Sequence, residues 1–312
     1  MARSWQVTSS IAVVVVTGCG RIDFDAVPAS DATTDTAPAC TSWGPFDAPV
    51  KLGSVNSIED DWCPMTIAND TELYFHSFRI DGSVSPGNIW RSKKSVDGTF
   101  GPAVEVTELD TDSQELVVAV TEDGLEAILT TNRNGGAGGY DLWHATRTSP
   151  TALFGVSTPL ANINDGMDQL DPVLSRDGLE LWFATGLLTG AVVFQVARRP
   201  DRTSPFGAPT TITELGASVM GTPSVSSDGL ELFFSASRAG GVGGWDVWAT
   251  QRASVVAAFD TPHLVPELSS PLHDACARLS ADGATMYLNY QGPDPVAGDG
   301  TAELWSATRT CL

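Results

Sequence analysis

The sequence predicts an all-β protein, a five-bladed β-propeller closed by its N-terminal strand, and three observations support this fold class. A unit of 51 to 54 residues recurs along the chain, and the pattern of each unit predicts short strands. A segment that the last unit lacks is found N-terminal to the first unit. A small sheet of three or four strands cannot bury both of its faces. Such units must therefore stack on their neighbours, as propeller blades do.

The repeat is defined by features at fixed offsets. Each unit opens at a turn residue, and the five opening residues lie 54, 54, 51 and 54 residues apart: Asn69, Asp123, Asp177, Asp228 and Asp282. An aromatic or apolar anchor follows at Trp90, Trp143, Phe194, Trp248 and Trp305. Four residues past each anchor stands a base: Lys94, Arg147, Arg198, Arg252 and Arg309. Such regularity indicates five copies of one structural unit.

Strands fit these units better than helices do. Runs such as LELFFSAS and DVWATQR are short, contain aromatic and β-branched residues, and end at Asp-Gly or Gly-Gly pairs. Glycine adopts positive φ at low cost, so these pairs are typical of tight turns between strands. No window keeps an apolar period of 3.6 residues for three turns. Each unit therefore predicts strand, tight turn, strand, Gly-rich turn and strand.

The pattern resembles the PD40 (WD40-like, TolB-type) β-propeller repeat over residues 43–312. Asp123 to Arg147 and Asp228 to Arg252 match it nearly completely, whereas Val192 and Val193 replace the Gly-Gly turn and the Asp of the third unit. The resemblance implies the propeller fold. It does not fix the function, because propellers host both enzymes and binding proteins.

The N-terminus resembles a bacterial lipoprotein signal. Arg3 is followed by the apolar run 11–16 and then by Val-Thr-Gly-Cys, in which Cys19 would carry the lipid, palmitate included, after cleavage of residues 1–18. An ordinary signal peptide beside a chance cysteine is the alternative. The run is shorter than the ~20 residues that span a bilayer, so attachment would come from lipid alone. Gly20, rather than Asp, favours the outer membrane, with the domain facing the periplasm or the cell surface.

Residues 19–39 are predicted to form a disordered acidic linker, and residues 40–312 the propeller. The linker is rich in Ala, Thr, Asp and Pro and poor in large apolar residues, so it lacks the material for a core.

The beginning of the propeller is predicted to close the ring. The segment Trp43 to Leu52, WGPFDAPVKL, contains the motif of a phenylalanine followed by a proline that ends the other blades. The fifth blade ends at Leu312 without this motif. A strand containing Phe46 is therefore expected to pair with the last blade. This closure removes free sheet edges and favours a monomer.

Four cysteines remain when Cys19 carries lipid, and they permit three pairings. Closure brings Cys40 near Cys311. Cys63 and Cys276 both lie six residues before their unit's opening residue, in blades that are neighbours only in a closed ring. An exported chain can oxidise both pairs, so we expect disulfides Cys40–Cys311 and Cys63–Cys276. Free buried thiols are the alternative.

The net charge of −21 limits the partners. Nucleic acid and anionic lipid surfaces are not expected as partners, because a basic footprint is missing. Cations, basic protein surfaces and neutral sugars remain, and so does the simple alternative that the acids keep the protein soluble.

The candidate site is an acidic mouth of the central channel. The positions eight and nine before each opening residue carry carboxylates in four of five units, and the candidate binding residues are Asp61, Trp62, Glu115, Asp168, Asp171 and Asp274. Clustered carboxylates can bind Ca²⁺, perform acid–base chemistry, or cap loops. Trp62 can stack on a sugar or pack between blades. No other cofactor is expected.

Catalytic motifs are missing from the sequence. GxSxG, HExxH and CxxC do not occur, and the four histidines lack metal-ligand spacing. The expected function is therefore a non-enzymatic envelope lipoprotein that binds a protein, a peptide or a glycan. The alternative is a five-bladed glycoside hydrolase or lyase using Asp61, Glu115 and either Asp168 or Asp274, which would need carboxyl groups roughly 5 to 9.5 Å apart.

Overall fold

The computed structural model describes residues 40, 42–79, 87–187, 192–215, 221–290 and 301–312. The predicted signal peptide, linker and lipid-bearing Cys19 lie outside these residues. Within them, no helix is long and apolar enough to cross a membrane.

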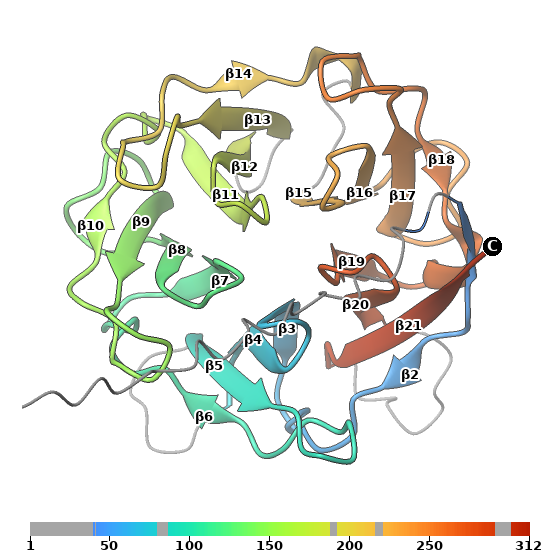
Figure 1. The fold of residues 1–312 in the computed structure, drawn as a ribbon, viewed down its shortest axis with the longest axis horizontal. Helices are drawn as coiled ribbons and strands as arrows, with labels where there is room; N and C mark the ends of the chain where they lie inside the picture. The colour runs from blue at the N-terminus through green and yellow to red at the C-terminus, as the bar shows by residue number, and fades with distance from the viewer. Residues whose placement is uncertain (1–39, 41, 80–86, 188–191, 216–220, 291–300) are drawn as a thin grey trace, which may run out of the picture. The chain divides into compact units, whose positions relative to one another are not determined.

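Five antiparallel sheets surround a central channel, which confirms the predicted five-bladed propeller (Figure 1). Four blades follow the chain in order from the channel outward. Blade 1 contains β3 (Asp61–Ile67), β4 (Glu72–Ser77), β5 (Asn88–Lys93) and β6 (Val104–Glu105). Blade 2 contains β7 (Glu115–Val120), β8 (Glu126–Thr131), β9 (Asp141–Thr146) and β10 (Thr158–Pro159). Blade 3 contains β11 (Asp168–Leu174), β12 (Glu180–Gly186), β13 (Val192–Arg198) and β14 (Thr210–Thr211). Blade 4 contains β15 (Gly221–Val225), β16 (Glu231–Ala236), β17 (Asp246–Gln251) and β18 (His263–Leu264).

Blade 5 combines the two ends of the propeller, as predicted. Its three inner strands are β19 (Asp274–Leu279), β20 (Thr285–Tyr290) and β21 (Leu304–Cys311), and β1 (Trp43–Phe46) and β2 (Val50–Lys51) both pair with β21. The short 3-10 helices η1 (Thr213–Leu215) and η2 (Pro266–Leu268) lie in connections.

Both expected disulfides lie at this seam. Cys40 is joined to Cys311 at the outer strands, with their Cα atoms 5.6 Å apart. Cys63 is joined to Cys276 between the innermost strands of blades 1 and 5, with a Cα separation of 4.7 Å.

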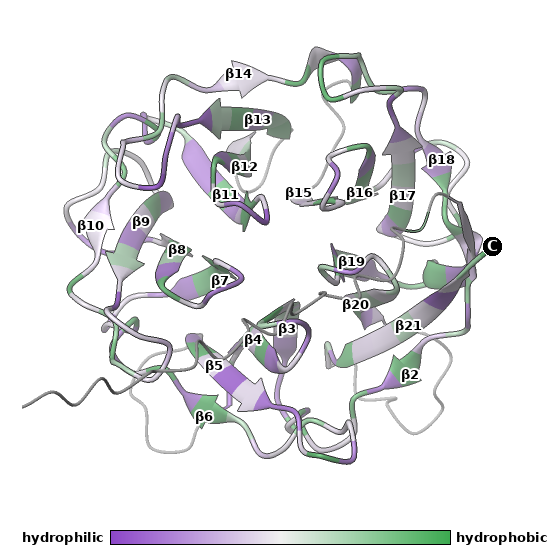
Figure 2. Ribbon diagram, viewed as in Figure 1, coloured by the Kyte–Doolittle hydropathy of each residue, from purple (hydrophilic) through white to green (hydrophobic). Residues whose placement is uncertain are grey.

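The core lies between neighbouring blades. Trp182 and Phe194 of blade 3, for example, share one buried cluster with Phe234 and Trp248 of blade 4, and the rings of Phe194 and Phe234 meet edge to face at 5.8 Å. Figure 2 shows hydrophobic segments along β13 and β17, the third strands of these blades. Each sheet therefore buries its faces against the next one, as a repeat of this size requires.

The opening Asp-Gly pairs form the turns between first and second strands. In blade 4, Asp228 Oδ1 accepts hydrogen bonds from Ser226 Oγ at 2.6 Å and from Leu230 N at 3.0 Å. Gly229 has φ +72°, a conformation that costs glycine little. The same turn occurs in blades 2, 3 and 5, and it fixes the register of the two strands.

The sequence alignment of blade 3 was wrong by one residue. Trp248 pairs with Phe234 in blade 4, but the corresponding Phe183 of blade 3 pairs with Gln195, not with Phe194. The basic residue four positions after this anchor, Gln195, is therefore Arg199. Its Nε donates to Gly178 O at 2.7 Å, as Arg252 Nε donates to Gly229 O. Matching aromatic to aromatic misled the alignment, because this blade carries a polar residue at its anchor.

Candidate functional site

A β-bulge in the innermost strands places side chains on the channel wall. The strand register shifts next to these positions, and four residues there have left-handed backbones with φ of 54° or 55°: Cys63, Asp171, Thr222 and Cys276. For residues other than glycine this conformation costs about 1 to 2 kcal/mol, and such strain concentrates at functional sites. The bulges therefore direct attention to the channel.

A cavity of about 440 Å³ opens at this level and is lined from all five blades. This volume lies within the range of small-ligand sites, roughly 300 to 1,000 Å³. The apolar part of the wall includes Trp62, Phe78, Leu116, Leu170, Val192 and Trp245. We call this space the mouth cavity.

The aromatic residues of the mouth cavity rest on the inner disulfide. Trp62, Leu116 and Trp245 pack, half-buried, against a buried cluster formed by Cys63, Cys276, Val117 and Ala275. The disulfide thus supports one wall of the cavity as well as the seam. Trp62, expected either to stack on a ligand or to pack between blades, lies on the wall itself.

Asp171 supplies a carboxylate to this wall. Its Oδ2 accepts the Thr222 backbone N–H at 3.0 Å, and a Cβ at Gly221 would overlap this oxygen, so glycine is needed there. Burial raises the pKa of Asp171 above its ordinary value, although Arg278 and the Thr222 N–H oppose this shift. Asp171 is half-buried and reaches solvent through the mouth cavity.

Arg278 closes the channel beyond Asp171. The buried guanidinium donates to Pro223 O at 2.8 Å and to Pro172 O at 3.3 Å. Burial lowers its pKa to about 10, although Asp171 opposes this shift. Arg278 lines a second, smaller cavity of about 80 Å³ at the other end of the channel. The mouth cavity therefore has the half-buried Asp171 in its wall, and the buried Arg278 guanidinium lies beyond it.

Three of the predicted carboxylates are buried rather than exposed at the mouth. Asp61, Glu115 and Asp274 each have an exposed fraction of 0%. Each one accepts the backbone N–H of the residue four positions earlier, which is Ser57, Thr111 and Ser270 respectively. The expected open acidic mouth is therefore corrected, and these residues take the alternative role of loop caps.

Arginines complete two of these caps. Arg79 Nη2 lies 2.6 Å from Asp61 Oδ1, and Arg133 Nη2 lies 2.9 Å from Glu115 Oε1. The negative charges of Asp61 and Glu115 are thus balanced by arginines of the protein itself.

Of the six residues predicted from sequence, Trp62 and Asp171 line the mouth cavity. Asp168 is half-buried at the start of β11 and accepts the Tyr140 N–H at 2.9 Å. The sequence analysis missed Phe78, Leu116 and Trp245. Leu116 had a usable signal, because it follows its buried carboxylate as Trp62 follows Asp61.

The described residues contain no group of three or more His, Cys, Asp or Glu side chains arranged to hold a metal ion. The candidate site is accordingly an aromatic cavity with two carboxylates, Asp60 and Asp171, in its wall.

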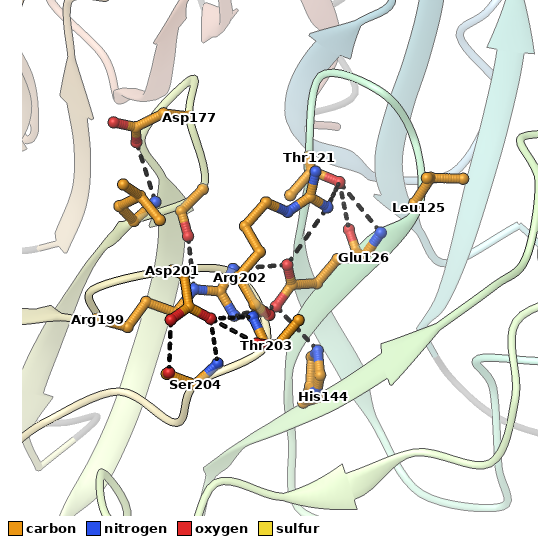
Figure 3. Close-up of polar contacts among 12 residues, drawn as sticks. Thr121, Leu125, Glu126, His144, Asp177, Arg199, Asp201, Arg202, Thr203 and Ser204 are labelled. Atoms are coloured by element: carbon orange, nitrogen blue, oxygen red, sulfur yellow. Dashed lines mark hydrogen bonds and ion pairs between the residues drawn. The ribbon is translucent and has the colours of Figure 1, made fainter.

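A second polar cluster lies between blades 2 and 3, next to a groove of about 360 Å³. Figure 3 shows Arg199 and Arg202 directed at Glu126, with His144 beside the same carboxylate. Arg199 Nη2 lies 2.6 Å from Glu126 Oε2, and His144 Nε2 lies 2.9 Å from Glu126 Oε1. Burial alone would raise the pKa of Glu126, but His144 and Arg199 lower it to about 2.

The cluster is closed on itself. Arg202 also pairs with Asp123, and Asp201 accepts the N–H groups of Thr203 and Ser204 at 2.9 and 3.0 Å. These charges are satisfied within the protein, so we interpret the cluster as a clasp between blades.

No protein-family model matches the chain, and no curated protein matches it in sequence. Solved structures do share its fold. TolB from Acinetobacter baumannii is 13% identical, covers 82% of this chain and has a TM-score of 0.49. The chain spans 56% of that protein's length.

Glycoside hydrolases are similar to the same extent. The catalytic domain of the GH62 α-L-arabinofuranosidase of Coprinopsis cinerea is 13% identical, with 88% of this chain and 98% of that chain covered and a TM-score of 0.52. A GH43 protein from Bacillus licheniformis is 10% identical, with 84% and 57% covered and a TM-score of 0.53. At such low identity the likeness shows the propeller fold alone.

Proposed function

We propose that this chain is a non-enzymatic binding propeller of the bacterial envelope, which docks a protein or peptide partner at the mouth cavity. The observation that carries the proposal is the cavity wall, where Trp62, Phe78 and Trp245 surround a space large enough for a ligand. Aromatic side chains dominate the binding energy of many interfaces, since they bury a large area at a small entropic cost.

A peptide fits this wall better than a glycan does. Sugar hydroxyls need hydrogen-bond partners on many sides, and an unpaired buried hydroxyl costs about 1 to 3 kcal/mol. Most residues of the described wall are apolar, and the polar ones are Asp60, His76, Thr130, Asp171, Thr222 and Ser235. Of these, the Thr222 and Ser235 hydroxyls already bond to each other at 3.2 Å. An apolar or amphipathic side chain loses less on entry.

The competing function is glycoside hydrolysis, because the GH62 and GH43 structures share the propeller fold. That chemistry needs two carboxyl groups on opposite sides of the scissile bond. Asp61, Glu115 and Asp274 are fully buried loop caps, and the two carboxylates on the cavity wall, Asp60 and Asp171, each hold a backbone N–H, those of Ala302 and Thr222. The binding function therefore has the stronger support.

A cavity-filling variant tests the docking site. Leu116→Trp should fill the mouth cavity and abolish retention of a specific envelope protein on the immobilised, oxidised chain. Leu153→Trp is the matched control, because Leu153 is 72% exposed in a loop of blade 2 and should leave retention unchanged. Equal retention by Leu116→Trp and the native chain would overturn the proposal. Turnover of any arabinoside or xyloside that disappears in Asp171→Asn would favour the hydrolase instead.

Anchoring at the outer membrane is tested separately. Cys19→Ser should move the protein from the membrane fraction to the soluble fraction and remove incorporation of labelled palmitate. A membrane-bound Cys19→Ser protein would contradict the lipid anchor but not the docking site.

A further inference from the structure

We propose that the mouth cavity receives an organic ammonium group, so that the docked ligand is a cation with an apolar body. This inference rests on the proposed function and names the chemistry of its ligand. It draws on three features of the cavity: a carboxylate within reach, an aromatic wall, and the charge of the whole molecule.

Two carboxylates line the cavity: Asp60, whose Oδ1 accepts the Ala302 N–H at 2.6 Å, and Asp171. The ligand's charge is assigned to Asp171. Among the described residues, the Thr222 N–H is the single hydrogen-bond donor to it, and this bond uses Oδ2. An ionised carboxylate has room for about four such bonds, so Asp171 keeps acceptor capacity toward the cavity. Its left-handed backbone, φ 55°, is what turns the side chain onto the wall.

Arg278 offsets this charge without using the carboxylate. Its guanidinium bonds to the carbonyl oxygens of Pro223 and Pro172, and no ion pair within 4.0 Å joins it to Asp171 in the described structure. Arg278 also lines the opposite cavity, whereas Asp171 lines the mouth cavity. A ligand entering at the mouth therefore meets the carboxylate before the guanidinium.

The aromatic wall suits a cation that has lost part of its water. Trp62, Phe78 and Trp245 all line the cavity, and tryptophan is the strongest cation–π partner among the side chains. Aromatic cages of this kind bind quaternary ammonium and methylated lysine groups. An apolar wall alone would not distinguish a cation from a neutral group of the same shape, but a wall with Asp171 in it does.

The net charge of −21 favours the same ligand. A strongly acidic surface raises the local concentration of cations and speeds their association, and it repels anions. An anionic ligand would in addition lie next to Asp171. The charge of the cavity and that of the molecule therefore agree.

Choline and 3,3-dimethylbutan-1-ol provide an isosteric pair that isolates the charge, measured by isothermal titration calorimetry on the full mature chain. Choline should bind at least 10-fold more tightly than the alcohol. Asp171→Asn keeps the shape and the bond from Thr222, and it should reduce this preference to threefold or less. Asp260→Asn is the matched control, because Asp260 is an exposed acid remote from the cavity wall and should leave the preference intact.

A second variant tests the aromatic wall. Trp62→Leu should weaken choline binding at least fivefold while leaving the thermal unfolding midpoint within a few degrees of the native value. N-acetyl-lysinamide separates the two sources of an ammonium group. If it binds more tightly than choline, the ligand is a lysine side chain of the partner, and the reverse order indicates a free quaternary amine.

The inference fails if choline and the alcohol bind equally, or if Asp171→Asn preserves the preference. The proposed function would survive that failure as long as Leu116→Trp still abolished partner retention. Conversely, a choline preference that depends on Asp171 would stand even if no envelope protein were retained.

Discussion

At residue 110 the chain carries an acid where two other blades carry asparagine. Asn164 accepts the Leu142 N–H and donates to the Leu142 carbonyl oxygen, both at 2.9 Å, and Asn56 makes the same pair of bonds to Leu304. Asp110 accepts the equivalent Ile89 N–H at 2.9 Å, but its Oδ2 has no hydrogen-bond partner among the residues that the structure describes. A protonated carboxyl would donate to the Ile89 carbonyl as the asparagine amide does.

The electrostatics of this position agree with a protonated Asp110. Burial raises its pKa to about 8, the negative charges of Glu115 and Glu105 act in the same direction, and the Ile89 N–H and Arg133 oppose it. The folded protein therefore holds this proton at a pH where the unfolded chain has lost it. It follows that the free energy of unfolding decreases as pH rises from about 4 to about 8. Above that range the contribution of Asp110 no longer changes with pH.

Asp110→Asn should remove this dependence. We expect the variant to gain stability relative to the native protein by up to about 1.4 kcal/mol per pH unit across that range, since one proton is involved. Urea unfolding at pH 5, 7 and 9 measures the difference. Asn164→Asp is the reciprocal control and should introduce the same slope into blade 2. Parallel curves for the native protein and Asp110→Asn would show that Asp110 is ionised in the folded state.

At the scale of the elements, each blade has a basic residue that binds it to its neighbour. Lys94, Arg147, Arg199, Arg252 and Arg309 each stack on a phenylalanine at 4.3 to 5.0 Å from the ring centroid. Each also reaches the preceding blade. Arg199 pairs with Glu126 at 2.6 Å and Arg309 with Glu231 at 2.7 Å. Arg147 and Lys94 bond to tyrosine hydroxyls, and Arg252 lies over the Trp182 ring.

Neighbouring arginines of blade 3 allow a sharp test of this clasp. Arg199→Met should destabilise the protein by about 3 to 5 kcal/mol, because it leaves Glu126 buried without its main partner. Arg198→Met should cost within about 0.5 kcal/mol, because the Arg198 side chain is 51% exposed. Chemical denaturation of both variants measures this. Equal effects would contradict the corrected register of blade 3.

At the scale of the whole molecule, closure joins the two ends of the propeller. Phe46 on β1 stacks on Arg309 of β21, so the N-terminal strand supplies the phenylalanine that blade 5 lacks. The Cys40–Cys311 bridge fastens this strand across a sequence separation of 271 residues. Because β1 pairs with β21, the outer edge of β21 is covered by the N-terminal strand.

Cys40→Ser/Cys311→Ser should lower the free energy of unfolding by about 3 to 5 kcal/mol, because the bridge closes a very long loop and restricts the unfolded chain. Thermal and guanidinium unfolding of the oxidised proteins measure the change. As a control, a reductant should destabilise the native protein more than the variant, which retains only the inner bridge. A variant as stable as the native protein would show that strand pairing alone closes the ring.

The sequence by itself determined the number of blades, their closure and the pairing of the cysteines. These features depend on period and on local turn chemistry. Asp228 and Gly229 form their turn with residues close by in the chain. The segment around Phe46 could be assigned to blade 5 from the repeat alone, because the last unit lacks this segment.

Only the tertiary structure decided the candidate site. In a strand, successive side chains point to opposite sides, so a bulge of one residue changes which of them face the channel. The bulges at Cys63 and Asp171 are not visible in the composition of the strands, and neither is the burial of Asp61 and Glu115. The register of blade 3 likewise depended on strand pairing, because its anchor position holds Gln195 instead of an aromatic residue. A period fixes how many blades there are, but the orientation of one side chain depends on neighbours that are distant in sequence.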